Sequence, residues 1–122
     1  MAKRILLVDD SDDLRSFLII MLQSYGYETI EAITGKEASE KAISEKPDLI
    51  LMDIGLPDIT GVDAAKTIKE NPITANIPII AYTAFPSRKW KQATLNAGIV
   101  KCLGKPFSLE ILKETIEKFI LS

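Results

Sequence analysis

The sequence of 122 residues contains no histidine and only one cysteine. Without histidine, the chain cannot form a Ser-His-Asp or Cys-His catalytic pair, a histidine-ligated zinc site or a phosphohistidine of its own. The single cysteine, Cys102, cannot form an internal disulfide, which fits a reducing compartment such as the cytoplasm. Chemistry on this chain therefore depends on carboxylates, hydroxyls, lysines, the backbone and a hard metal ion.

Long hydrophobic runs and an excess of one charge are also lacking. The longest apolar run, Phe17 to Leu22, is too short to span a membrane, and the N-terminus lacks the pattern of a signal peptide. Fifteen Lys and Arg residues face seventeen Asp and Glu residues, and this balance disfavours a non-specific nucleic-acid-binding surface. We expect one globular domain over residues 1–122, with no membrane insertion and no direct nucleic-acid contact.

Short apolar runs alternate with longer amphipathic segments five times along the chain. Strands are predicted over residues 5–8, 27–32, 48–52, 77–82 and 100–103. Helices are predicted over about 11–25, 35–45, 62–70, 87–97 and 108–120. Strands that alternate with helices indicate a parallel sheet covered by helices on both faces.

Local signals define the ends and the buried faces of these helices. Ser11 and Ser108 are predicted to cap the first and the last helix, and Gly26 and Gly98 to end the first and the fourth. In the first helix, six apolar residues recur at helical spacing and predict one buried stripe: Leu14, Phe17, Leu18, Met21, Leu22 and Tyr25.

Polar residues stand where four of the predicted strands end. Asp9 and Asp10 follow the first strand and Asp53 follows the third, whereas Thr83 and Lys105 come at the ends of the fourth and fifth. Ligands bind outside the carboxyl ends of parallel strands, so these side chains are expected in one cleft. Carboxylates in close proximity repel one another unless a cation lies between them, and oxygen ligands suit Mg²⁺.

The remaining groups of this cleft suit phosphoryl chemistry. A lysine and a threonine both bind phosphoryl oxygens, and a carboxylate can act as the nucleophile. Metal, lysine, hydroxyl and carboxylate are the parts that phosphoryl transfer requires. Asp12 and Asp13, by contrast, are interpreted as first-turn acids that are favoured by the helix dipole.

Four motifs carry a resemblance that covers the whole chain. They are Val8-Asp9-Asp10, Met52-Asp53-Ile54-Gly55-Leu56-Pro57 with Gly61, Tyr82-Thr83-Ala84 and Lys105-Pro106-Phe107. In this order and at these separations, the sequence resembles response-regulator receiver domains, the CheY-like family of two-component signalling. The resemblance implies a doubly wound α/β fold, a flavodoxin-like (βα)5 three-layer sandwich whose parallel sheet has the strand order 2-1-3-4-5.

The resemblance also implies a role for each motif. Asp53 would accept a phosphoryl group from a phosphohistidine on a histidine kinase or a histidine phosphotransfer protein. Mg²⁺ or Mn²⁺ would be held by Asp10, Asp53 and the backbone carbonyl of Gly55, with Asp9 acting through a metal-bound water. Thr83, Lys105 and the Ala84 N–H would contact the phosphoryl group, and the Lys105-Pro106 bond would be cis. Hydrolysis of the aspartyl phosphate, in part by the domain itself, would reset the switch.

Three positions, Cys102, Pro86 and Gly55, depart from the family pattern, and Trp90 stands where a polar residue is commoner in the family. Cys102 occupies a place where receivers usually carry Tyr or Phe, which puts the usual coupling to Thr83 in doubt. Pro86 could stiffen the loop before the fourth helix, and Gly55 would leave the phosphoryl group open to water and speed dephosphorylation. Trp90 is interpreted as slightly more suited to an exposed partner anchor than to the core.

The output surface implied by the family is the face of helix 87–97, strand 100–103 and the last helix. Arg88, Lys89 and Lys91 make its near edge basic, which suits either an acidic partner or simple solvation. Other hypotheses remain open at this point: a receiver-like scaffold that is not phosphorylated, a receiver fragment of a larger regulator or hybrid kinase, a small Mg²⁺-dependent phosphohydrolase, and a flavin-binding electron carrier.

Overall fold

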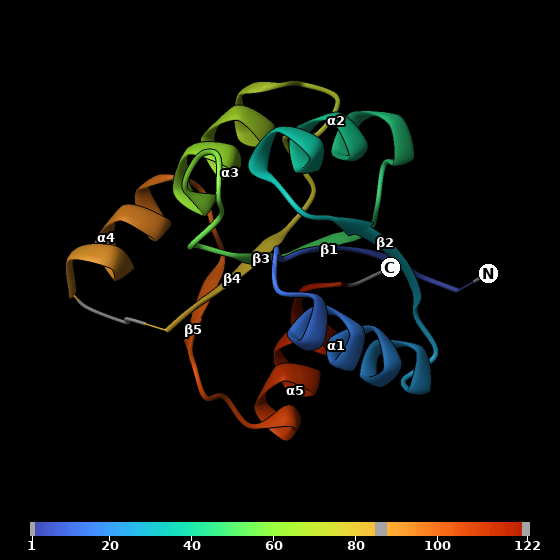
Figure 1. Cartoon of the computed structure of the whole chain (residues 1–122). Coiled ribbons are helices and arrows are strands. Elements are labelled where there is room, and N and C mark those ends of the chain that lie inside the picture. Colours follow the sequence, from blue (N-terminus) through green and yellow to red (C-terminus); the bar gives the residue numbers. More distant parts are fainter. Residues whose placement is uncertain (1, 85–87, 121–122) are drawn as a thin grey trace.

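In the computed structural model, residues 2–84 and 88–120 are described, and they form strands and helices in strict alternation (Figure 1). The strands are β1 (Arg4–Val8), β2 (Glu28–Ala32), β3 (Leu49–Asp53), β4 (Ile79–Thr83) and β5 (Lys101–Gly104). The helices are α1 (Asp12–Ser24), α2 (Gly35–Glu45), α3 (Gly61–Glu70), α4 (Arg88–Asn96) and α5 (Leu109–Phe119). Within these described ranges, no helix has both the length and the apolarity that crossing a membrane requires.

The strands form one parallel sheet in the order β2-β1-β3-β4-β5, which confirms the predicted fold class. Val8 pairs with Met52, Asp53 with Tyr82, and Thr83 with Gly104. The carboxyl ends of β1, β3, β4 and β5 are therefore nearly level. The residues that end or follow these strands come together at one edge of the sheet.

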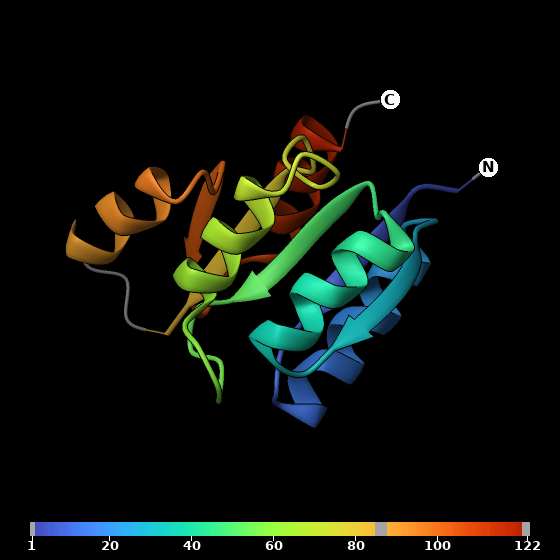
Figure 2. The same ribbon diagram turned by 90° about the horizontal axis from the view of Figure 1, so that it is seen from above.

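Helices cover both faces of the sheet, so the central strands are buried on both sides (Figures 1 and 2). Successive side chains of a strand point to opposite faces, and this alternation divides the core in two. One half packs Ile5, Leu7, Leu51 and Ile80 against α1 and α5. The other half packs the residues between them against α2, α3 and α4, and it is rich in alanine.

Capping side chains begin the helices as their sequences predict. The Ser11 hydroxyl accepts a hydrogen bond from the Leu14 N–H at the start of α1, and Ser108 accepts from the Ile111 N–H at the start of α5. After α1 the chain turns at Gly26, where φ is +93° and only glycine is free of strain. These short-range signals confirm the predicted helix ends.

The expectation of one buried stripe on the first helix was only partly right. Leu18 and Leu22 of α1 are fully buried, but Phe17 is 47% exposed. Each residue turns an α-helix by about 100°, so Phe17 points to the side of α1 when Leu18 faces the sheet. Helix α4 is described from Arg88, and the interpretations placed on Pro86 and on a helix start at Ser87 lie outside the described residues.

Candidate functional site

Three aspartates meet at the carboxyl edge of the sheet, as predicted. Asp9 and Asp10 follow β1 and Asp53 ends β3, and one carboxylate oxygen of each lies within 4.8 Å of the others. Asp9 is completely buried and Asp53 nearly so, whereas Asp10 is exposed to solvent. A set of oxygen donors with this much negative charge fits a hard divalent cation such as Mg²⁺ or Mn²⁺.

Asp53 is held between a backbone amide and a lysine. Its Oδ1 accepts the Gly55 N–H at 3.1 Å, and its Oδ2 lies 3.4 Å from the Lys105 Nζ. Burial raises the pKa of Asp53, and the charge of Asp9 acts in the same direction, whereas the Gly55 N–H and the Lys105 ammonium oppose the shift. A nearby cation would favour the ionised, nucleophilic form of this carboxylate.

Asp9 is fixed by partners on every side. Its Oδ1 accepts the Ser11 N–H at 2.8 Å, and its Oδ2 accepts the Tyr82 hydroxyl at 2.5 Å. Arg15 donates to its backbone carbonyl at 2.8 Å. The carboxylate of Asp10, in contrast, has no hydrogen-bond partner among the residues that the structure describes.

Strand alternation explains which residues face this acidic cluster. Asp9 continues the positions of Ile5 and Leu7, and Asp53 those of Leu49 and Leu51, so both lie on the α1 and α5 side. On β4, Ile80 and Tyr82 point to this same side of the sheet. The alternation points Thr83, like Ile79 and Ala81, toward the opposite face of the sheet. Thr83 nevertheless lies at the same edge as the acidic cluster, where β4 ends.

Lys105 enters the site over an aromatic ring. Its Nζ lies 5.0 Å from the centroid of the Tyr82 ring, and Phe107 packs on that ring at 5.5 Å with a 56° tilt. The Lys105 N–H also bonds the Thr83 carbonyl at 2.7 Å, and the Lys105-Pro106 peptide bond is cis, as the resemblance implied. Thr83 is buried at the end of β4, and the exposed Ala84 follows it.

Two glycines set the space around Asp53. A side chain at Gly61 would lie 2.6 Å from the Asp53 carbonyl oxygen and 2.8 Å from Cα of Ile54, so only glycine lets α3 approach β3 this closely. A side chain at Gly55 would meet nothing nearer than the Asp53 Oδ1 at 3.9 Å. The Gly55 side of the carboxylate is therefore open.

The loop between β3 and α3 is attached to a neighbouring helix. Asp58 accepts the N–H groups of Gly35 and Lys36 at the start of α2, at 2.8 and 2.9 Å. These two bonds lower the pKa of Asp58 to about 2. The loop that carries Gly55 is thus linked to α2 as well as to the two elements that it joins.

The α4–β5 region holds Cys102 and Trp90, two of the unusual residues noted in the sequence. Cys102 is half-buried beside Ala81, and burial raises the pKa of its thiol, which argues against a reactive cysteine. Trp90 is also half-buried, with part of its indole packed against the core and part open to solvent, and its role as a partner anchor stays a prediction. Burial of part of this large ring is favourable in water.

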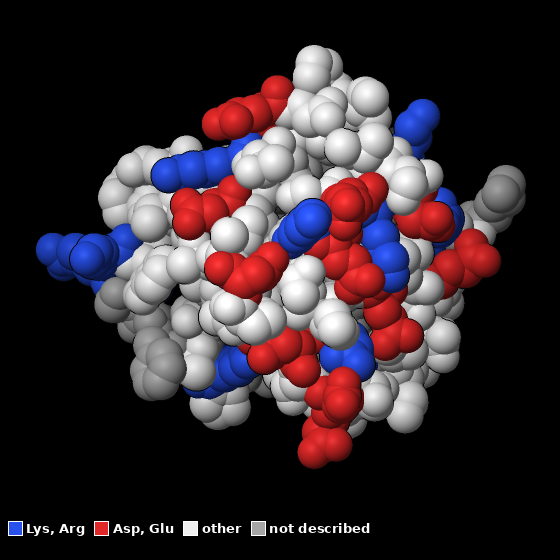
Figure 3. Space-filling view, turned by 45° about the horizontal axis from the view of Figure 1, so that its top comes forward, with Lys and Arg blue, Asp and Glu red and all other residues white. Residues whose placement is uncertain are grey.

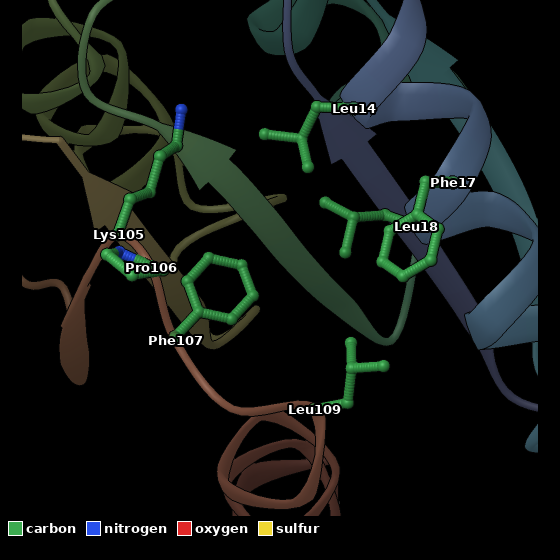
Figure 4. Close-up of a pocket in the computed structure, with 7 residues that line it drawn as sticks. All are labelled: Leu14, Phe17, Leu18, Lys105, Pro106, Phe107 and Leu109. Atoms are coloured by element: carbon green, nitrogen blue, oxygen red, sulfur yellow. The ribbon is translucent and has the colours of Figure 1, made fainter.

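An apolar groove of about 500 Å³ continues from Lys105 between α1 and the start of α5 (Figure 4). The rings and branched chains that line it point toward one another, whereas the Lys105 ammonium points away at one end. Its apolar lining consists of Leu14, Phe17, Leu18, Pro106, Phe107 and Leu109. The acidic cluster therefore borders a surface that can contact an apolar partner.

Three residues of the site were given no role from the sequence. Tyr82 was named only as part of a motif, and Arg15 and Asp58 were not singled out, yet each binds part of the site or of its loop. For Tyr82 a signal was present. It is a polar ring at the end of an apolar strand, and it shares the alternation of the buried residue Ile80.

Comparison with known proteins places these features in a family. Residues 5–117 match the model of the response regulator receiver domain. The polar-differentiation response regulator DivK of Brucella anthropi is 33% identical over 120 residues, which are 98% of each chain. The family match decides against the phosphohydrolase and the flavin carrier, which belong to other families.

Solved structures agree in sequence and in fold. The chemotaxis protein CheY4 of Vibrio cholerae has a TM-score of 0.91 and 32% identity over 98% of this chain and 99% of its own. The receiver domain of the sensor histidine kinase PA1611 of Pseudomonas aeruginosa, solved with a magnesium ion coordinated in its active site cleft, has a TM-score of 0.92 and 32% identity over both whole chains. The acidic cluster, the strand order and these matches agree, and the chain belongs to the response regulator receiver domain family.

Proposed function

We propose that Asp53 is the phosphoacceptor of a His-to-Asp phosphorelay and that the acceptor state controls binding of a downstream protein. The observation that carries the proposal is the Asp53 carboxylate, nearly buried, 3.4 Å from Lys105 and within 4.8 Å of two further carboxylates. Asp10, Asp53 and the Gly55 carbonyl would hold Mg²⁺ or Mn²⁺, with Asp9 acting through a water. The metal would neutralise charge on the transferred group.

The chain's own residues supply the other parts of the transfer. An oxygen of Asp53 attacks phosphorus, the P–N bond to the donor imidazole breaks, and its electron pair leaves with the ring nitrogen. Lys105 and Thr83 bind the phosphoryl oxygens, and the open space at Gly55 admits the water that later hydrolyses the aspartyl phosphate. The apolar groove beside Lys105 offers a contact surface for the protein that carries the phosphohistidine, a histidine kinase or phosphotransfer protein.

The α4-β5-α5 face is proposed as the output surface. Leu95 is 60% exposed and Val100 36% exposed, and both line a hollow together with Lys91 and Lys101. Lys and Arg side chains also gather at the end of the molecule where α4 lies (Figure 3). Apolar groups among lysines suit a partner segment that is both apolar and acidic.

The test is intact mass after incubation with Mg²⁺ and acetyl phosphate. One added phosphoryl group is expected on the wild type and on the matched control Asp13→Asn, and none on Asp53→Asn. An adduct that persists in Asp53→Asn would contradict the site. No adduct on the wild type from either acetyl phosphate or a phosphorylated histidine kinase would favour a scaffold that is not phosphorylated.

A further inference from the structure

One buried side chain, Tyr82, touches both the acidic and the basic half of the proposed phosphoryl site. It is fully buried at the penultimate position of β4. Its hydroxyl donates to Oδ2 of Asp9, and its ring lies under the ammonium of Lys105. Asp9 and Tyr82 are 73 residues apart in sequence, so this contact depends on the completed fold.

The hydroxyl completes the hydrogen bonding of Asp9. One oxygen of Asp9 is occupied by the Ser11 N–H and the other by Tyr82. Hydrogen bonds to both oxygens fix the plane of a carboxylate, and hydrogen bonds to a charged acceptor are strong. The Asp10 carboxylate has no comparable support among the described residues, so the two neighbouring acids differ in how firmly hydrogen bonds orient them.

The Tyr82 hydroxyl can act only as a donor in this place. The Asp9 carboxylate can only accept, so the phenol supplies the hydrogen of this bond. Removal of the hydroxyl would leave one oxygen of a fully buried carboxylate without its partner. Partners that orient a metal-binding group from behind affect metal affinity by about 10- to 100-fold in other proteins.

The ring makes a second, separable contribution. Phe107 holds it from one side at 5.5 Å, and the Lys105 Nζ lies over it at 5.0 Å. A cation over an aromatic face is attracted by the ring quadrupole. The ring therefore supports the ammonium in the direction of Asp53, 3.4 Å away.

We infer that Tyr82 is a positioning residue of the phosphoryl site, whose hydroxyl orients Asp9 for the divalent cation and whose ring supports Lys105. The inference deepens the proposed function and rests on it. The contact joins Tyr82 of β4 to Asp9, the residue after β1. The four sequence motifs do not reveal it, because Tyr82 acts only through Asp9 and Lys105.

The experiment is a calorimetric titration with Mg²⁺ alone, which needs no phosphodonor. Tyr82→Phe, which keeps the ring, is expected to weaken Mg²⁺ binding about tenfold. The matched control is Tyr25→Phe, because Tyr25 also lies under a lysine, Lys113, but on the side of α5. This control is expected to bind Mg²⁺ within about twofold of the wild type. Tyr82→Leu, which also removes the ring, is expected to slow phosphorylation by acetyl phosphate below the rate of Tyr82→Phe.

Asp9→Asn tests whether the hydroxyl acts through Asp9. In that background, Tyr82→Phe is expected to change Mg²⁺ affinity by less than about twofold, since coupled residues are not additive. Unchanged affinity in Tyr82→Phe, or a full tenfold loss that persists beside Asp9→Asn, would overturn the inference. Failure of the proposed function would show differently, as a missing phosphoryl adduct on a wild type that binds Mg²⁺ normally.

If Tyr82→Phe does not fold, the inference is tested instead by the ultraviolet absorbance of the wild type. Mg²⁺ draws charge from Asp9 and so weakens the acceptor of the Tyr82 hydrogen bond, which changes the absorbance of one tyrosine. The change is expected in the wild type, Tyr25→Phe and Tyr27→Phe alike. Its absence from the wild type at saturating Mg²⁺, or its loss in either control, would overturn the inference.

Discussion

The two faces of the sheet differ in what they pack and in what they do. The face under α1 and α5 carries large side chains and three residues of the proposed phosphoryl site, Asp9, Asp53 and Tyr82. The face under α2, α3 and α4 carries many alanines, and Cys102 and Trp90 are half-buried there. The proposed chemistry thus lies on the face with the large side chains, whereas the alanine-rich face leads to α4, at the edge proposed to bind the output partner.

The largest loss of stability is expected at Gly61, where α3 lies against the backbone of Asp53. Gly61→Ala would place a methyl group 2.6 Å from the Asp53 carbonyl oxygen, and backbone atoms cannot yield as a side chain can. We expect the free energy of unfolding to fall by about 3 kcal/mol, measured in urea. Gly55→Ala is the matched control and is expected to stay within about 0.5 kcal/mol of the wild type. Equal effects of the two changes would show that α3 does not constrain Asp53.

Cys102 tests whether the α4–β5 edge is open to reagents. Its raised thiol pKa means a smaller thiolate fraction at a given pH, and only the thiolate is alkylated. We expect iodoacetamide to react about tenfold more slowly with the native chain than with the urea-unfolded chain at pH 7.5. Equal rates would mean that Cys102 becomes fully accessible to the reagent in the native protein. The two faces of the sheet would then differ in mobility.

Asp53→Asn tests the contrast between the two faces by removing a charge from the face under α1 and α5. Because the pKa of Asp53 is raised on folding, the native state binds its proton more tightly than the unfolded state does. The resulting loss of stability is absent below the unfolded pKa and present at neutral pH. We expect Asp53→Asn to raise Tm by about 4 °C at pH 7 without Mg²⁺, and not at pH 3. A gain of equal size at both pH values would assign the effect to packing instead of charge.

The smallest effect is expected at the loop that joins the site to α2. The pKa of Asp58 is lowered to about 2, so its hydrogen bonds stabilise the native state above the unfolded pKa of about 4 and are lost as pH falls toward about 2. Asp58→Asn is expected to lower Tm by about 2 °C at pH 6 and by much less at pH 2. A difference in Tm that does not vary with pH would contradict this role.

Local and periodic signals were sufficient to predict most of the fold. The helix caps Ser11 and Ser108 act on residues three positions away, and the strand ends of a parallel sheet meet at one edge whatever the details of packing. The cluster of Asp9, Asp10 and Asp53 follows from the same rule. The cis form of the Lys105-Pro106 bond, in contrast, came from the family resemblance alone.

What could not be predicted depends on rotation and on distant partners. The exposure of Phe17 and the inward packing of Trp90 are set by the orientation of α1 and α4, which hydropathy determines only approximately. The hydrogen bond between Tyr82 and Asp9 joins β4 to the end of β1, and that of Asp58 joins a loop to α2 across 23 positions in the chain. No local pattern marks such pairs.

The half-buried position of Trp90 has a practical consequence. It is the only tryptophan in the sequence, so light absorbed selectively by indole excites one place on α4. Indole emission shifts to longer wavelength when water gains access to the ring, and Trp90 lies at the boundary between the core and the solvent. The unlabelled wild-type chain therefore carries its own fluorescent reporter beside the proposed output face, and a rearrangement of α4 can be followed in real time without an attached dye.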